Sequence, residues 1–377
     1  MPFAAALSEH PLPTHATGEV VGRILEELGP APDLAVVFVT APLAGALDDI
    51  AATIRATLQP TTLLGATAVS VLGGDREVEE ESAISLFAAQ MSPVMPVRVK
   101  AERLGDGWRL ESTLAGPLGA RTLVLLADPF TFPVEDFLEK LAVEEPELQV
   151  IGGMASAARG PGGNRLVLNG EVVADGAVGV LLDANTAATT LVSQGCRPVG
   201  QPLVVTRAER NVIYEIAGRP ALERLQELAA SLSPDDRRLL AAGVHLGRVM
   251  DESRAEFGRG DFLVRQVVGA DREAQSLAVG DEIEVGTTIQ FHVRDADSAD
   301  EDLRALLTGA SSSAALVFTC NGRGTHLFDA PHHDASVINS QLAGGATSGM
   351  FCAGEVGPIG GRNFVHGFTA SVLLFDD

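Results

Sequence analysis

The chain has 377 residues, 46% of them apolar, which predicts a folded globular protein of two or three domains rather than a disordered one. Its formal net charge of −23 argues against partners such as nucleic acid or an anionic membrane, since both need basic patches. Three widely spaced cysteines without a CxxC pair, and an N-terminus without a basic leader, predict a cytoplasmic protein with reduced thiols.

A first repeat of the order strand, helix, strand, strand is expected after an N-terminal tail, residues 1–19. The apolar run at 34–42 predicts a buried strand, and apolar positions spaced by three or four residues predict a helix over 44–58. Two further strands are expected within 61–74 and 82–90. This region therefore predicts a β-α-β-β repeat.

The second repeat shows the same order. Its elements are expected at 121–129, 133–143, 148–163 and 175–183. In both repeats the same number of residues separates the end of the first strand from a glycine of the second strand: Thr40 from Gly65, and Ala127 from Gly152. An equal spacing of this kind indicates an internal repeat.

The C-terminal stretch predicts another clear repeat. A strand is expected at 314–322, followed by a helix that Asp334 would cap, a strand and turn at 348–361, and a last strand at 368–375. A degenerate repeat is expected within 211–269, where a strand and a helix precede two more strands.

Glycine and proline cluster at 195–203, which predicts the boundary between two halves. The expected domains are 20–194, with two repeats, and 195–377, with one degenerate and one clear repeat. The fold class is therefore α+β, with largely antiparallel or mixed sheets flanked by helices.

Several familiar motifs are missing from the sequence. It contains no GxxxxGK[ST], no complete dinucleotide fingerprint and no GxSxG, so no cofactor is predicted. The acidic tract at 75–82 favours a solvated hairpin loop over a cation site. His332, His333 and Asp334 favour a loop and a helix cap over a metal site, because neighbours on an extended segment point in opposite directions.

Polar side chains and glycines gather around the predicted strand ends of the C-terminal repeat. Arg323 can bind a carboxylate through its planar fork, and Asn321 and Asn363 can each donate and accept. Glu355 can bind an ammonium, so the set suits a zwitterion such as an amino acid. In the alternative, Arg323 and Glu355 pair with each other. The equivalent turns of the first two repeats carry no such charges.

Cys320 offers a different chemistry. A thiolate beside glycine amides can attack a carbonyl, with His326 or His366 as its base, as in a hydrolase or isomerase. The alternative reading is a small buried residue at a strand end, where free cysteine is common. We expect the second reading, for Cys352 as well, and therefore no enzyme.

The motifs CNGRG at 320–324, AGEVGPIGGRN at 353–363 and HGFTASV at 366–372 resemble the C-terminal signature of the FIST family. Segments 152–182 and 195–223 are similar to the middle of that family. The resemblance implies a FIST N and a FIST C domain, and a sensory protein that binds a small ligand and signals inside the cell through a separate protein partner. It would place the ligand contacts on Asn321, Arg323, Gly324, Glu355, Asn363 and His366.

Overall fold

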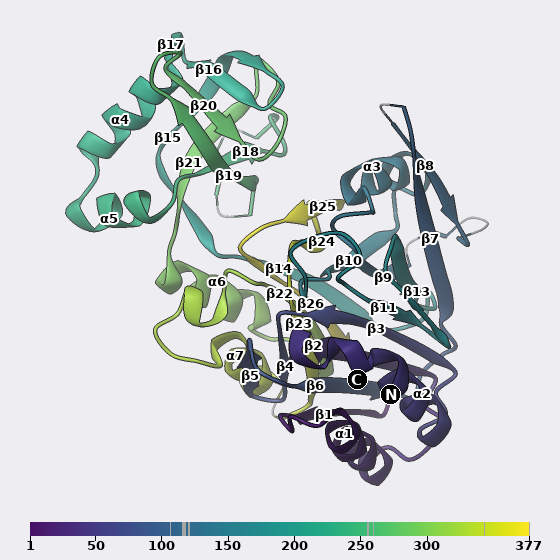
Figure 1. The fold of residues 1–377 in the computed structure, drawn as a ribbon. Coiled ribbons are helices and arrows are strands. Elements are labelled where there is room, and N and C mark those ends of the chain that lie inside the picture. The colour runs from purple at the N-terminus through teal and green to yellow at the C-terminus, as the bar shows by residue number, and fades with distance from the viewer. Residues whose placement is uncertain are drawn as a thin grey trace. The chain divides into compact units, whose positions relative to one another are not determined.

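The computed structural model describes residues 1–105, 107–114, 118–119, 121–254, 256–258, 260–342 and 344–376. The chain packs as two compact units, which Figure 1 shows coloured along the sequence. Unit 1 comprises Met1–Ser193, Leu303–Val365 and Thr369–Asp377, and unit 2 comprises Gln194–Asp302 and His366–Phe368. No helix among the described residues is long and apolar enough to cross a membrane.

Unit 1 confirms the three clear β-α-β-β repeats. Repeat 1 consists of β2 (Leu34–Thr40), α2 (Leu47–Thr57), β3 (Thr62–Ala68) and β6 (Ile84–Ala89). Repeat 2 consists of β9 (Thr122–Ala127), α3 (Val134–Glu144), β10 (Gln149–Met154) and β13 (Ala177–Leu181). Repeat 3 consists of β22 (Ser312–Cys320), α7 (His333–Gln341), β23 (Ala346–Cys352) and β26 (Thr369–Asp376). In each repeat the first strand pairs parallel with the second and antiparallel with the last.

The three repeats are joined by hairpins that leave one repeat and complete the sheet of another. The hairpins are β4 (Ser70–Gly73) with β5 (Arg76–Glu79), β11 (Leu166–Leu168) with β12 (Glu171–Val173), and β24 (Glu355–Ile359) with β25 (Arg362–His366). Strand β4 of repeat 1 pairs with β23 of repeat 3. Strand β24 of repeat 3 pairs with β10 of repeat 2, and β11 of repeat 2 pairs with β3 of repeat 1. The exchange closes a ring, which can be followed through the strand labels of Figure 1.

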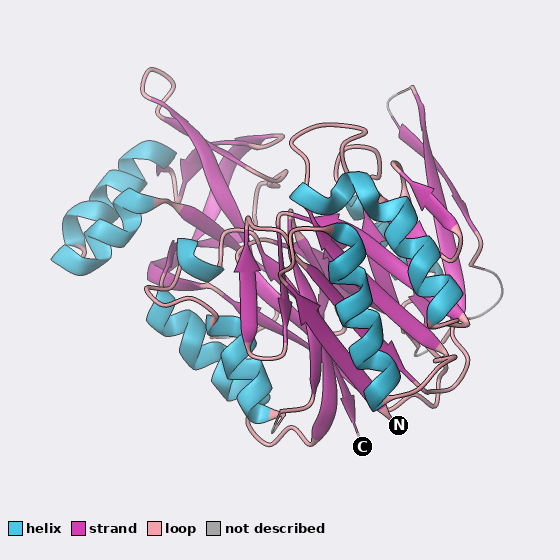
Figure 2. Cartoon of the chain, turned by 60° about the horizontal axis from the view of Figure 1, so that its bottom comes forward, coloured by secondary structure: helices cyan, strands magenta, loops and turns pink. Residues whose placement is uncertain are grey.

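Each sheet has one face on a helix and the other on a core shared by all three repeats. Phe38, Leu126 and Phe318 occupy the same position in β2, β9 and β22, and all three belong to the shared core. Their neighbours Val37, Leu125 and Val317 face the helical side instead. Because both faces are covered, the central residues of the first strands are apolar, as is typical of buried parallel pairs. Figure 2 shows helices lying along the strands.

The remaining elements of unit 1 are strands that extend the three sheets and helices outside the three repeats. Additional strands are β1 (Phe3–Ser8), β7 (Met95–Leu104), β8 (Gly107–Ser112) and β14 (Ala188–Gln194). Additional helices are α1 (Pro13–Glu27), the short η1 (Ala41–Ala46) and η2 (Gly324–His326), and α6 (Ala296–Leu307), which runs from unit 2 into unit 1.

Unit 2 is a closed antiparallel barrel. Its strands follow the order β15 (Cys196–Glu209), β21 (Thr288–Arg294), β18 (His245–Val249), β19 (Phe262–Asp271), β20 (Ser276–Val279) and β16 (Val212–Ile216), and β16 returns to β15. The short strand β17 (Arg219–Pro220) and the helices α4 (Ala221–Ser231) and α5 (Pro234–Ala242) complete it.

The expected degenerate repeat is therefore corrected. Its strand, helix and two further strands exist as β16, α4, β18 and β19, but β16 pairs with β15 and β20, all antiparallel. A hydrophobic pattern specifies the type of element and leaves its partner open. Closing the barrel also pairs strand edges that would otherwise stay exposed.

One glycine recurs at the same place in each repeat of unit 1. Gly65, Gly152 and Gly349 lie opposite the first strand, and a Cβ there would come within 2.5, 1.9 and 2.2 Å of a carbonyl oxygen of that strand. The equal spacing seen in the sequence therefore has a steric cause, since a side chain cannot fit.

We expect Gly349→Ala to destabilise the protein by about 3 kcal/mol or more, because the methyl group must push apart β22 and β23. Gly18→Ala is the matched control, since Gly18 lies in α1 with nothing within 4 Å of an added Cβ, and it should stabilise by up to about 1 kcal/mol. Urea unfolding measures both. Equal stabilities of the two variants would contradict the steric argument.

Candidate functional site

The parallel strands β22 and β23 end side by side, with Cys320 opposite Cys352. Asn321 and Arg323 follow the first of these strands, and Glu355 follows the second. The backbone amide of Asn321 donates to the carbonyl of Cys352, which ties the two ends together. Three of the predicted residues therefore lie at one edge of the sheet of repeat 3.

Arg323 is fully buried and forms a bidentate ion pair with Asp334. Its Nε and Nη2 lie 2.7 and 2.8 Å from the two carboxylate oxygens. The Thr319 hydroxyl donates to the same carboxylate at 2.7 Å. Burial by itself would raise the pKa of Asp334, but Arg323 holds that pKa below its usual range. Asp334 in turn keeps the buried guanidinium charged.

This geometry corrects the expected role of Asp334. The N-cap of α7 is His332, whose backbone is left-handed with φ +66°, and Asp334 lies in the first helical turn. Its carboxylate binds Arg323 instead of capping the helix. Of the two readings of Arg323, pairing with Glu355 is replaced by pairing with Asp334. A group of three or more potential metal ligands does not occur within the described residues.

Glu355 occupies a position that is apolar in the other repeats. It lies opposite Gly153 on β10, as Val71 lies opposite Met350 and Leu166 opposite Ala66. Val71 and Leu166 are both fully buried in the shared core. A carboxylic acid has thus replaced a hydrophobic side chain at the centre of unit 1.

The environment of Glu355 favours its neutral form. Its Oε2 accepts hydrogen bonds from the Thr369 amide and hydroxyl, at 3.2 and 2.8 Å. Burial raises the pKa of Glu355 to about 8, although the bonds from Thr369, the charge of Arg323 and the Cys320 thiol all oppose this rise. Near neutral pH the side chain therefore carries its proton.

Two atoms of this pair of residues are buried and make no hydrogen bond of normal geometry within the described residues, although the Cys320 thiol lies close enough to Glu355 to favour its charged form. They are Nη1 of Arg323 and Oε1 of Glu355, which we call the two open atoms. An unsatisfied buried polar atom costs about 1–3 kcal/mol, and more when the group is charged. Such a cost is typical of a place where a ligand or water supplies the missing partner.

The polar groups at the equivalent strand ends of repeats 1 and 2 are satisfied internally. The Thr40 hydroxyl accepts from the Ala83 amide at 2.8 Å and donates to the carbonyl of the same residue. The fully buried Asp128 accepts from Asn164 at 2.9 Å and from Thr131 at 2.7 Å. Repeat 3 therefore departs from its two counterparts in chemistry as well as in sequence.

The other predicted ligand residues, Asn363, Gly324 and His366, lie in different parts of the structure. The side-chain amide of Asn363 links β25 to the start of β10. It donates to the Leu148 carbonyl and accepts from the Val150 amide. Gly324 has φ +56°, and a Cβ there would lie 2.7 Å from the Glu79 carboxylate. His366 belongs to unit 2, whereas the other five predicted residues belong to unit 1.

The acidic tract at 75–82 is a hairpin, as predicted, but it is not solvated throughout. Glu77 on β5 is buried and accepts a hydrogen bond from the Ala335 amide, in the first turn of α7, at 3.0 Å. Burial raises the pKa of Glu77 to about 7. Glu79 accepts from the amide and hydroxyl of Thr325. The hairpin belongs to repeat 1, and its exchange onto repeat 3 was not visible in the sequence.

Cys320 and Cys352, at the same edge, are buried thiols outside any disulfide. Burial raises the pKa of the Cys352 thiol, and the neighbouring Glu355 adds to the rise. A Cβ on Gly153 would lie 2.3 Å from the sulfur of Cys352, which is therefore tightly packed. These properties fit the expected role of Cys352 as a small buried residue.

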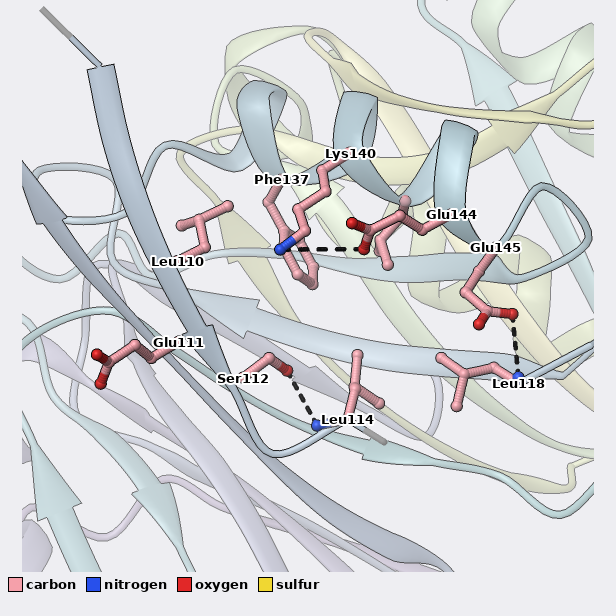
Figure 3. A pocket seen from close by; sticks show the side chains of 10 residues that line it. Leu110, Glu111, Ser112, Leu114, Leu118, Phe137, Lys140, Glu144 and Glu145 are labelled. Carbon is pink, nitrogen blue, oxygen red and sulfur yellow. Dashed lines mark hydrogen bonds and ion pairs between the residues drawn. The ribbon is translucent and has the colours of Figure 1, made fainter. Parts of the chain in front are cut away.

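A separate surface groove of about 540 Å³ lies between β8 and α3. Figure 3 shows side chains that line it, among them the apolar Leu110 and Phe137 and the carboxylates of Glu111, Glu144 and Glu145. Glu144 approaches Lys140 at 3.9 Å and Glu145 accepts from the Leu118 amide. None of the residues that line this groove belongs to the predicted ligand set.

Comparisons with known proteins agree with the motifs. The FIST N domain model matches residues 33–219 and the FIST C domain model matches residues 221–358. An uncharacterized protein of Mycobacterium tuberculosis is 38% identical over the full length of both chains. Another, of Mycobacterium bovis, is 40% identical over 96% of this chain and 95% of its own. A glutamate 5-kinase of Agrobacterium fabrum is 27% identical over 55% of this chain and 58% of its own.

We expect the stability of the protein to fall as the pH rises from about 5 to about 8. The folded state keeps the proton of Glu355 up to about pH 8, whereas an unfolded carboxyl releases it near pH 4.3, so rising pH favours unfolding. Glu355→Gln should remove this loss of unfolding free energy with rising pH, which is on the order of a few kcal/mol over the whole range. Glu77→Gln is the comparison, because its contribution ends near pH 7. An unchanged slope in Glu355→Gln would refute the assignment.

Arg323→Met should destabilise the protein by about 3–5 kcal/mol, because it leaves the buried Asp334 carboxylate without its cation. Asp334→Asn in the same chain should restore part of that loss, since the uncompensated charge is then gone. Chemical unfolding of both single variants and of the double variant measures the coupling. Strictly additive losses would show that the ion pair is energetically unimportant.

Proposed function

The chain belongs to the FIST family, and we propose that it is a sensory protein that binds a small zwitterion, such as an amino acid, at Arg323 and Glu355. The protein acts inside the cell without catalysing a reaction, and a separate protein partner reads the bound state. This role combines what the family likeness implies with the chemistry of one buried site in unit 1.

The observation that supports the proposal is the pair of open atoms at the end of the β22–β23 strand pair. One belongs to a guanidinium already anchored by Asp334, and the other to a carboxyl group placed where repeats 1 and 2 have Val71 and Leu166. An apolar residue would be the cheaper choice for folding at this position. Retaining an acid there is understandable if the acid meets a ligand.

The two groups complement a zwitterion. A ligand carboxylate can accept a charge-assisted hydrogen bond from Nη1 of Arg323, and a ligand ammonium can donate to Oε1 of Glu355. The ammonium stabilises the ionised carboxylate, so binding lowers the pKa of Glu355 and displaces its proton. Binding near neutral pH should therefore release close to one proton.

The site is closed in the ligand-free structure, because Arg323 and Glu355 are both 0% exposed. Entry of a ligand requires a local opening. One segment that can open is α7, which carries Asp334, the partner of Arg323, and which meets the β4–β5 hairpin of repeat 1 at Glu77 and Ala335. A ligand that favours the open or the reclosed arrangement shifts the population between them. That shift is the signal that a partner protein can read.

A thermal-shift screen of the common amino acids tests the proposal. We expect at least one to raise the melting temperature, and calorimetry in buffers of different ionisation enthalpy to show release of about one proton at pH 7. Glu355→Gln should abolish the proton release, and Arg323→Lys should weaken binding about tenfold or more while keeping a cation for Asp334.

Two controls define the outcome. Glu144→Gln alters an exposed carboxylate of the surface groove and should leave binding unchanged. Cys320→Ser keeps a hydrogen-bond donor beside Glu355 and should therefore retain binding, whereas a cysteine-dependent hydrolase or isomerase would lose its activity in this variant. Wild-type protein that responds to no amino acid, or a response that survives both Glu355→Gln and Arg323→Lys, would refute this site.

A further inference from the structure

A second set of buried polar groups lies on the outer wall of the barrel in unit 2. His245 on β18 and His292 on β21 are directly opposite each other in an antiparallel pair. Their chain neighbours Leu246 and Phe291 point into the core of the barrel, so the two imidazoles share its outer face. Both histidines are 1% exposed.

His245 is incompletely satisfied. Within the described residues, neither of its ring nitrogens makes a hydrogen bond of normal geometry, although the backbone of Gly243 slightly favours the charged ring. Burial lowers the pKa of His245 to about 4, and the charge of Arg294 adds to this effect. The ring is therefore neutral near pH 7 and offers one N–H donor and one acceptor nitrogen.

Phe368 covers this histidine and a neighbouring cation. Its ring lies edge-on to the imidazole of His245, with centroids 4.6 Å apart. The guanidinium carbon of Arg294 lies 4.7 Å from the centroid of the same ring. Phe368 has φ +62°, a left-handed conformation that is strained for a bulky residue. It follows Gly367, where a Cβ would meet nothing within 4 Å.

We propose that unit 2 holds a second ligand site, in which a small oxyanion binds to Arg294 and the N–H of His245 when Phe368 moves aside. Neither Arg323 nor Glu355 belongs to this site, although Thr369, which bonds to Glu355, directly follows Phe368 in the chain. The ligand class is a carboxylate or an inorganic phosphate, whose oxygens accept from both donors.

Three features select an oxyanion. Arg294 is a permanent cation whose planar group binds carboxylate and phosphate oxygens well. Its charge, which already depresses the pKa of His245, would repel a metal ion at the imidazole. A neutral imidazole N–H gives a second donor without requiring a proton from solvent.

The covering segment provides the route of entry. His366–Phe368 is a three-residue stretch of unit 2 that lies between parts of the chain belonging to unit 1. The positive φ of Phe368 costs on the order of 1–3 kcal/mol, so an anion that displaces its ring recovers part of the energy needed to open the site. Strain of this kind is common at ligand clamps.

The experiment uses the full chain labelled with ¹⁵N in its histidines. Sodium acetate and inorganic phosphate are titrated separately, to about 10 mM, while the ring nitrogen signals are recorded at pH 7. We expect the His245 signals to move with at least one anion. A response to acetate alone assigns a carboxylate, and a response to phosphate alone assigns a phosphate.

Variants test the contacts by calorimetry. His245→Phe and Arg294→Met should each weaken anion binding about tenfold or more, and His245→Phe should fold normally because it removes buried polar atoms. His10→Phe, in unit 1, is the matched control and should bind as the wild type does. The proposal is overturned if neither anion moves the His245 signals, if binding survives His245→Phe, or if Arg323→Lys abolishes it.

Discussion

The exchange of hairpins among the three repeats is the constraint on which unit 1 depends. A single β-α-β-β repeat has a parallel strand pair with an open edge and an uncovered apolar face. The hairpin of another repeat covers each edge, and the shared core that contains Phe38, Leu126 and Phe318 covers the faces. Since every repeat both gives and receives a hairpin, the three stabilise one another, which is why residues 303–377 pack mainly with the first half of the chain.

The candidate site is a local departure from this repeated arrangement. Glu355 takes a core position that Val71 and Leu166 fill elsewhere, and Arg323 is buried beside it on a partner, Asp334, that belongs to the helix of the same repeat. The acid at position 355 weakens the hydrophobic contribution of the shared core. Proteins commonly concentrate such costs where a ligand is bound, and the satisfied networks at Thr40 and Asp128 show that the repeat itself does not demand them.

Several expectations failed for a common reason. The acidic tract, the role of Asp334 and the degenerate repeat all depended on which segment would lie next to which. Glu77 is buried because its hairpin reaches α7, more than 250 residues further along the chain. The unsatisfied ring nitrogens of His245 could not be predicted from the sequence, because a single histidine in an apolar strand is common. The residues that surround its ring come from β21 and from position 368.

The sequence by itself determined the elements, the three clear repeats, the recurrent glycines and the family, because these depend on short-range periodicity and on motifs that are contiguous in the chain. It also singled out Arg323 and Glu355 as charges added to a repeated frame. Only the tertiary structure decided that Arg323 pairs with Asp334, that Glu355 replaces a core residue and holds its proton, and that His366 lies in the other unit. Those facts depend on strand partners and burial, which are set by contacts between residues far apart in sequence.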